Sequence, residues 1–145
     1  MFAIVRTPID PVRLDAAVRD DLFGAVVSFL GIVRERADDG RMVRGLEYEA
    51  YDAMALAEFE TIAGEAYQRF GDVRLAIVHR VGRLNVGEIA VAVIVGSPHR
   101  GDAFDACEYA IDEVKSRAPI WKKELYADGD ERWKSNACGA HESAV

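Results

Sequence analysis

The alternation of apolar and polar side chains divides the chain into strands of period two and helices of period 3.6. Segment 45–51 alternates apolar positions with Glu47 and Glu49, which is typical of a half-buried strand. Segment 24–34 is rich in β-branched residues and is predicted to be a buried strand. The same patterns predict strands at 2–5, 73–82 and 88–97, and helices at 11–22, 52–70 and 102–117. Because these elements mix without a strict strand–helix–strand rhythm, the predicted class is α+β.

Two long helices are expected to cover a mixed or antiparallel sheet. The first begins at Asp52, and the second ends before Pro119, which cannot continue a helix. The apolar stripe of the second helix is predicted to be Phe104, Cys107, Ile111 and Val114. No repeat or linker interrupts the chain, so we expect one domain over 1–145 with a mobile tail over 134–145.

The composition narrows the class of protein. The 145 residues are 50% hydrophobic and 30% charged, as in a soluble globular domain. The net charge of −7 argues against a nucleic-acid-binding surface. The longest apolar runs, Leu22–Val33 and Ile89–Pro98, are shorter than the roughly 20 residues that span a membrane, and the first residues do not resemble a signal peptide. Two cysteines, Cys107 and Cys138, form no disulfide framework, which favours a reduced, cytoplasmic setting.

The segment GSPHRGD, 96–102, lies at a predicted strand-to-helix junction. It sets His99 and Arg100 beside the amino end of a helix, where free N–H groups and the helix dipole favour anions. Its glycine spacing resembles a phosphate-binding loop, but Asp102 and Ala103 stand where that loop needs Lys and Ser or Thr. Nucleoside triphosphate binding is therefore excluded. Two interpretations stay open: a weaker anion site, or a solvated turn capped by Asp102.

Four basic side chains and no acidic one occur between positions 115 and 123 of this acidic chain: Lys115, Arg117, Lys122 and Lys123. Lys115 follows Val114 by about 100° around the helix, so it lies at the edge of the apolar stripe. A lysine beside apolar surface loses hydration, which lowers its pKa and suits it to proton transfer or nucleophilic attack. The alternative is that the four cations only stabilise the carboxyl end of a helix.

Other reactive side chains give weaker signals. Arg34 ends the predicted buried strand and Arg36 follows it, but charges at strand ends are common. Cys107 lies on an apolar stripe and His79 on an apolar strand face, so both are predicted to be structural. No Ser-His-Asp arrangement occurs, and no metal or cofactor is expected. The candidate metal ligands near the C-terminus are too few for a zinc site: Cys138 and His141.

Five motifs, in order along the chain, together resemble the large, catalytic subunit of molybdopterin synthase. They run from residue 24 to residue 133 and read GAVVSFLGIVR, LEYEAYDAMA, VHRVGRLNVGE, SPHRGDAF, and VKSRAPIWKKE followed by GDERW. The resemblance implies an α/β-hammerhead fold and a homodimer with a small ubiquitin-like sulfur-carrier subunit at each end, a heterotetramer. It also implies a sulfurtransferase that converts cyclic pyranopterin monophosphate to molybdopterin. The two sulfurs would come from the thiocarboxylate at the carrier's C-terminal Gly-Gly.

The resemblance further implies the residues of the site. By motif, Lys115 and Lys122 correspond to catalytic lysines. The implied substrate-binding residues are Ile32, Val33, Arg34, His99, Arg100, Lys115, Lys122, Lys123 and Glu124. A basic cluster suits this chemistry, because the cyclic phosphate and the thiocarboxylate are both anions that repel each other in a pocket of low dielectric. Relatives often carry a further basic residue after GD-x-RW. In this chain either Lys134 or Arg132 substitutes for it, or the contact is absent.

Two other functions stay open. A non-catalytic module that grips the tail of a ubiquitin-like carrier would need lysines for a carboxylate, but it would not need Arg34, His99 and Arg100 together. An acyl- or phosphoryl-transfer enzyme would use Lys115 covalently, and it would work without a protein sulfur donor.

Overall fold

Eight strands and three helices follow one another in the computed structural model, which describes residues 1–135. The strands are β1 (Phe2–Val5), β2 (Ala25–Ile32), β3 (Val43–Ala50), β4 (Arg74–Arg80), β5 (Gly82–Asn85), β6 (Ile89–Ser97), β7 (Ile120–Tyr126) and β8 (Glu131–Ser135). The helices are α1 (Pro11–Val18), α2 (Asp52–Phe70) and α3 (Arg100–Arg117). The predicted α+β class is confirmed. Within the described residues, no helix is long and apolar enough to cross a membrane.

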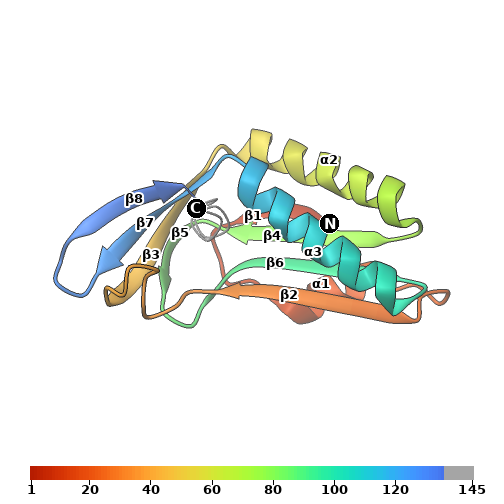
Figure 1. Cartoon of the computed structure of the whole chain (residues 1–145), viewed down its shortest axis with the longest axis horizontal. Coiled ribbons are helices and arrows are strands. Elements are labelled where there is room, and N and C mark those ends of the chain that lie inside the picture. The colour runs from red at the N-terminus through yellow and green to blue at the C-terminus, as the bar shows by residue number, and fades with distance from the viewer. Residues whose placement is uncertain (136–145) are drawn as a thin grey trace.

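The first sheet has the strand order β1-β4-β6-β2 and lies between α1 on one face and α2 and α3 on the other (Figure 1). β1 runs parallel to β4, and the other pairs are antiparallel. Successive side chains of a strand point to opposite faces. Leu75 and Ile77 of β4 therefore pack with α2 and α3, whereas Ala76 and Val78 pack with α1. The two central strands are covered by helices on both faces.

Local sequence sets the helix ends. Asp10 Oδ1 accepts a hydrogen bond from the backbone N–H of Val12 at 3.0 Å and so caps α1. α2 ends at Gly71, whose φ of 84° lies in the left-handed region that glycine adopts at low cost. α3 ends where Pro119 holds Ala118 in an extended conformation. That break turns the chain directly into β7.

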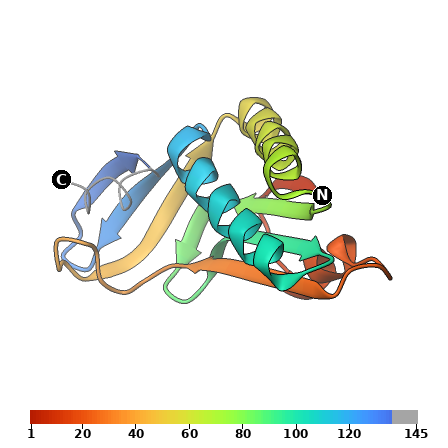
Figure 2. The ribbon, with the colours of Figure 1, turned by 45° about the vertical axis from the view of Figure 1, so that its right-hand side comes forward.

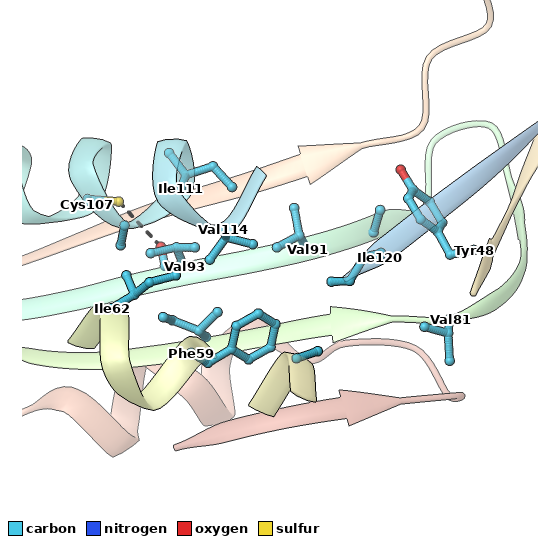
Figure 3. Close-up of a cluster of buried hydrophobic side chains, with 14 of the residues drawn as sticks. Tyr48, Phe59, Ile62, Val81, Val91, Val93, Cys107, Ile111, Val114 and Ile120 are labelled. Carbon is cyan, nitrogen blue, oxygen red and sulfur yellow. Dashed lines mark hydrogen bonds between the residues drawn. The ribbon is translucent and has the colours of Figure 1, made fainter. Parts of the chain in front are cut away.

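Small residues let α3 lie close to the first sheet. Its buried residues are Ala103, Ala106, Cys107, Ala110, Ile111 and Val114. The Cys107 thiol donates a hydrogen bond to the Val93 carbonyl at 3.5 Å (Figure 3), and burial raises the pKa of this thiol to about 11. Its predicted core role is confirmed. The expectation for Phe104 is wrong: its side chain is 60% exposed, because Ala103 takes the inner position and Phe104 follows about 100° around the helix.

The second sheet has the strand order β5-β3-β7-β8 and is antiparallel throughout. It stands at the end of the first sheet, beside the C-terminal end of α3 (Figures 1 and 2). Tyr48 of β3 lies opposite Lys122 of β7, which in turn lies opposite Lys134 of β8. Residues that are directly opposed across a strand pair share a face. These three side chains therefore lie on one face of the second sheet, and Lys123 lies on the other.

Several sequence-based expectations need correction. The strands form two sheets rather than one, and β2 is half-buried because it is an edge strand. The helix predicted over 11–22 ends at Val18, where Arg19 becomes extended. The tail predicted over 134–145 begins inside β8, which ends at Ser135. The rest of that tail lies outside the described residues and includes Cys138 and His141.

Candidate active site

A cavity of about 160 Å³ opens where the two sheets meet. Its apolar wall includes Leu46 and Val91, and Figure 3 shows Val91 and Tyr48 at the end of the core that borders it. The charged residues that line it are Arg34, Arg36, Asp38, Lys115, Lys122 and Glu124. Among them four cations face two carboxylates, although the whole chain carries a net charge of −7. The cavity is therefore a local positive site on an acidic protein.

The lysines reach this cavity from two different elements. Lys115 lies in the last turn of α3, next to the buried Val114, as the offset around the helix predicts. Lys122 enters from β7 beside Tyr48, its partner across the strand pair. All four lysines of the chain occur between residues 115 and 134. The other fourteen basic side chains are arginines, since the chain has 18 Lys and Arg in total.

The surroundings of Lys115 favour its uncharged form. Burial lowers the pKa of Lys115, and the positive charges of Lys122 and Arg34 lower it further. Asp38 opposes this shift, but its Oδ1 lies 2.6 Å from the guanidinium of Arg34. Within residues 1–135, no carboxylate forms an ion pair with Lys115 or Lys122. Both ammonium groups are thus open to an anionic ligand, and Lys115 gives up its proton more readily than an exposed lysine does.

Glu124 is the buried carboxylate of the site, with only 5% of its surface exposed. Its Oε1 accepts a hydrogen bond from the Tyr126 hydroxyl at 2.8 Å and lies 2.8 Å from Lys134 Nζ. Lys134 therefore neutralises Glu124 within the same chain. Arg132, a basic residue within the GDERW motif, forms an ion pair with Asp130, with 3.4 Å between its Nε and Asp130 Oδ2.

Four of the implied binding residues lie outside the cavity, and two of these, Val33 and Lys123, are neighbours in sequence of residues that line it. Lys123 is on the opposite face of the second sheet, where its Nζ lies 3.0 Å from Glu47 and 3.3 Å from Glu131. Val33 is buried in the core, with 3% of its surface exposed, whereas its neighbour Ile32 lines the cavity. Neighbouring residues of one motif thus have different surroundings, because successive side chains of an extended chain point in opposite directions.

His99 and Arg100 lie at the far end of α3. Both are exposed: His99 is the N-cap residue of the helix and Arg100 its first residue. Lys115 follows Arg100 by fifteen positions along the helix, which at 1.5 Å per position is about 22 Å. One protomer therefore carries two separate cationic groups. The first lines the cavity, and the second surrounds the amino end of α3.

Sequence reasoning missed the contribution of Tyr48 and His79 to the cavity. Burial raises the pKa of Tyr48 to about 12, and the charge of Glu124 adds to the shift. Burial lowers the pKa of His79 to about 4. The regular alternation along β4 correctly indicated that His79 points into the protein, but not that a cavity begins there.

Comparison with known proteins identifies the family of the chain. The sequence profile described as "MoaE protein" matches residues 4–117, about four fifths of the chain. This chain belongs to the MoaE family of molybdopterin synthase catalytic subunits. The MoaE match includes Arg34, His99, Arg100 and Lys115, while Lys122 and Glu124 follow it.

Individual MoaE relatives extend the similarity beyond the profile. The molybdopterin synthase catalytic subunit of Nostoc sp. is 48% identical over 139 residues, covering 94% of this chain and 84% of its own. That of Bacillus subtilis is 44% identical over 132 residues, covering 91% and 83%. The crystal structure of molybdopterin synthase from Staphylococcus aureus has a TM-score of 0.87 and 41% identity, covering 92% of this chain and 96% of that one.

A further MoaE-like structure contains a partner. It is the complex of subunits 1 and 2 of the molybdopterin-converting factor from Helicobacter pylori. Its matching chain has a TM-score of 0.72 and 26% identity, and the match covers 91% of this chain and 88% of that one.

Proposed function

We propose that this chain acts as the catalytic subunit of molybdopterin synthase, a sulfurtransferase, and that sulfur is transferred in the cavity between its two sheets. The substrate would be cyclic pyranopterin monophosphate, and the donor would be the thiocarboxylate of a small ubiquitin-like carrier. The observation that carries the proposal is the pair Lys115 and Lys122, which share one cavity and form no ion pair within residues 1–135. The two-sheet architecture fits the α/β-hammerhead type that the sequence resemblance implies.

Charge explains why the cavity suits two anions. A phosphate and a thiocarboxylate repel each other, and the repulsion grows as water is excluded. Lys122 and Arg34 line the same cavity as Lys115, and their positive charges add to its lowered pKa. Their cationic groups would stabilise negative charge that develops when sulfur adds to the pterin side chain.

Lys115 is suited to proton transfer in this reaction. Its pKa is lowered by burial, so its protonated and neutral forms differ less in free energy at neutral pH than those of an exposed lysine. It would protonate or deprotonate the reacting groups as the sulfur adds and the carrier's acyl group leaves. Glu124 would orient Lys122 or the pterin, since it lines the same cavity two residues along β7.

A homodimer would bring the second cationic group to the cavity. His99 and Arg100 lie about 22 Å from Lys115 along α3, too far to hold the same small substrate within one protomer. If α3 of one protomer points its amino end at the partner's cavity, the helix dipole and Arg100 would bind the substrate phosphate there. Two carriers would then complete a heterotetramer. The Helicobacter pylori complex supports a two-subunit assembly for this family.

The decisive experiment mixes the protein with cyclic pyranopterin monophosphate and a thiocarboxylated carrier, and measures a dithiolene product by mass. Formation of molybdopterin supports the proposal. A non-catalytic module for the carrier tail would instead bind the carrier with unchanged affinity and form no product. A covalent acyl-transfer enzyme would retain the carrier's mass on the peptide that contains Lys115.

A further inference from the structure

The loop between β2 and β3, residues 33–42, forms one side of the cavity. Its backbone folds back on itself. The amide of Ala37 donates to the carbonyl oxygen of Arg41 at 2.9 Å, and the amide of Gly40 donates to the carbonyl oxygen of Ala37 at 2.9 Å. The loop is therefore folded as one unit. The residues that it adds to the cavity are Arg34, Arg36, Ala37 and Asp38.

Both cavity arginines of this loop are held by groups of the loop itself. The guanidinium of Arg34 lies 2.6 Å from Oδ1 of Asp38. Nη1 of Arg36 donates to the carbonyl oxygen of Gly40 at 3.3 Å. These bonds tie the two side chains to the loop, but they do not tie the loop to the rest of the protein. The place of the loop therefore decides where its two positive charges lie.

Arg41 fastens the loop to the turn between β7 and β8, which lies beside it (Figures 1 and 2). Its Nη2 lies 3.0 Å from Oδ2 of Asp128, and its Nη1 lies 3.1 Å from Oδ2 of Asp130. The guanidinium carbon also lies 3.6 Å from the centroid of the Tyr126 ring. One partly exposed ion pair contributes little to stability, but here two carboxylates and an aromatic ring hold a single guanidinium.

The tyrosine under Arg41 leads back to the cavity. Tyr126 has only 1% of its surface exposed, and its hydroxyl donates to Oε1 of Glu124 at 2.8 Å. Glu124 lines the cavity, so the ring that Arg41 covers is fixed at its other end by the site itself. Arg41 therefore sets the position of the loop relative to β7, the strand that carries Lys122 into the cavity.

We propose that Arg41 is a positioning residue: it holds the 33–42 loop, and with it Arg34 and Arg36, in the place where the cavity binds its anionic substrate. The inference rests on the function proposed for the cavity. Without Arg41 the loop would leave this place part of the time, and a substrate would bind only the fraction of molecules in which the loop is in position. The apparent affinity falls by that fraction.

Arg44 provides a matched control for the loss of an arginine at this turn. It lies in β3, where its Nε donates to the carbonyl oxygen of Tyr126 at 3.1 Å and its Nη2 lies 3.8 Å from Glu131. Strand pairing between β3 and β7 already holds this contact, since Gly45 pairs with Leu125. Removing Arg44 therefore takes away bonds to the same hairpin without releasing the loop.

Limited digestion with trypsin tests the position of the loop without any catalysis. Trypsin cleaves a folded chain where the backbone opens locally, and the rate follows the population of the open form. We expect Arg41→Met to speed cleavage after Arg36 about tenfold. Arg44→Met should change it less than about twofold. The masses of the fragments identify the cleaved bond, and urea unfolding checks that each variant is folded.

Kinetics test the consequence for the substrate. In Arg41→Met the KM for cyclic pyranopterin monophosphate should rise about tenfold and kcat should change less than about twofold, because bound substrate restores the loop. Arg41→Lys should recover part of the loss, since it keeps the charge but not the two-pronged contact. A merely structural role would reduce the fraction of active protein, which lowers kcat and leaves KM unchanged.

The partner carboxylates make the test specific. An Asp128→Asn/Asp130→Asn variant should raise KM nearly as much as Arg41→Met, and combining all three changes should add less than about a further twofold. An unchanged cleavage rate or an unchanged KM in a folded Arg41→Met protein overturns the proposal, as does an equal effect of Arg44→Met. If Arg41→Met does not fold, the Asp128→Asn/Asp130→Asn variant decides. If the wild type makes no molybdopterin, the proposed function fails, while digestion still tests the loop.

Discussion

Lys134 Nζ lies 2.8 Å from Oε1 of Glu124, so the last basic residue of β8 binds the buried carboxylate of β7. Glu124 also lines the cavity that Lys122 enters. The ion pair keeps this carboxylate from neutralising Lys122. Lys122 lies two residues before Glu124 on β7, so both side chains are on the same face of the strand. The cation of β8 therefore preserves the positive charge of the cavity indirectly.

Removing this cation should weaken both the fold and the site. In Lys134→Met the buried Glu124 loses its charged partner, which we expect to cost roughly 1–3 kcal/mol in the free energy of unfolding. Turnover should fall several-fold as Glu124 turns to Lys122. Urea unfolding and molybdopterin formation measure the two effects. Lys134→Arg should retain both properties, and a Lys134→Met/Glu124→Gln double variant should regain stability. Unchanged stability in Lys134→Met contradicts the role of the ion pair.

Lys115→Ala should abolish sulfur transfer and leave the fold intact. The side chain lies at the edge of the core and forms no ion pair within the described residues, so its removal takes away little packing. A loss of at least about 100-fold in kcat is expected for a group that transfers protons. Circular dichroism and thermal melting check the fold of the variant. Near-normal turnover by a folded Lys115→Ala protein would remove this residue from catalysis.

The adjacent lysines of β7 offer a matched pair. Lys122 faces the cavity, whereas Lys123 forms ion pairs with Glu47 and Glu131 on the other face. We expect Lys122→Met to lower kcat about 100-fold, and Lys123→Met to lower it less than about threefold, because exposed ion pairs contribute little. Steady-state kinetics of both variants measure the difference. Equal losses would show that the two faces of the second sheet are not separate in the working assembly.

Mixed dimers test whether the two ends of α3 act together. Neither Lys115→Ala nor Arg100→Ala should be active alone if each cavity needs Arg100 from the partner. After unfolding and refolding of an equal mixture, half of the dimers contain one copy of each variant, and each of these has one intact site. About a quarter of wild-type activity should return. No recovery, with dimer exchange verified by mass, contradicts a shared site.

His79 should make the protein sensitive to acid. Its pKa is about 4 in the folded chain and about 6.5 when unfolded, so between these values only the unfolded chain binds the proton. The contribution to stability is complete above pH 6.5 and is lost as the pH falls to 4, by up to roughly 3 kcal/mol. Urea unfolding of wild type and His79→Gln at both ends of this range measures it. The wild type should lose more stability than the variant. Parallel losses would mean that His79 is protonated in the folded state as well.

Short segments of sequence determine some features of this fold, such as helix ends, but not others, such as the pairing of distant strands. Asp10 acts through its side chain, and Gly71 and Pro119 through their own backbone geometry, so these three helix ends depend on a few neighbouring residues. The second sheet depends on pairing Tyr48 with Lys122, more than 70 positions apart, which no local pattern contains. The burial of Phe104 was predicted from hydrophobicity, but the short distance between α3 and the sheet favours alanine.

Local sequence likewise predicts some features of the candidate site but not others. The position of Lys115 at the edge of an apolar stripe follows from helical periodicity, and its lowered pKa agrees with that prediction. The binding of Glu124 by Lys134 requires the register of β7 and β8, and the approach of His79 to the cavity requires both sheets. These contacts join segments that are distant in sequence, so a single sequence does not reveal them.

The length of helix α3 sets the distance between the two cationic groups of each protomer. One inserted residue would lengthen it by about 1.5 Å and would also turn Lys115 by about 100° relative to Arg100. Four inserted residues would nearly restore the direction but add about 6 Å to the length. If Arg100 binds substrate in the partner's cavity as proposed, the number of residues between Arg100 and Lys115 is fixed by the need for both ends of α3 to meet their targets.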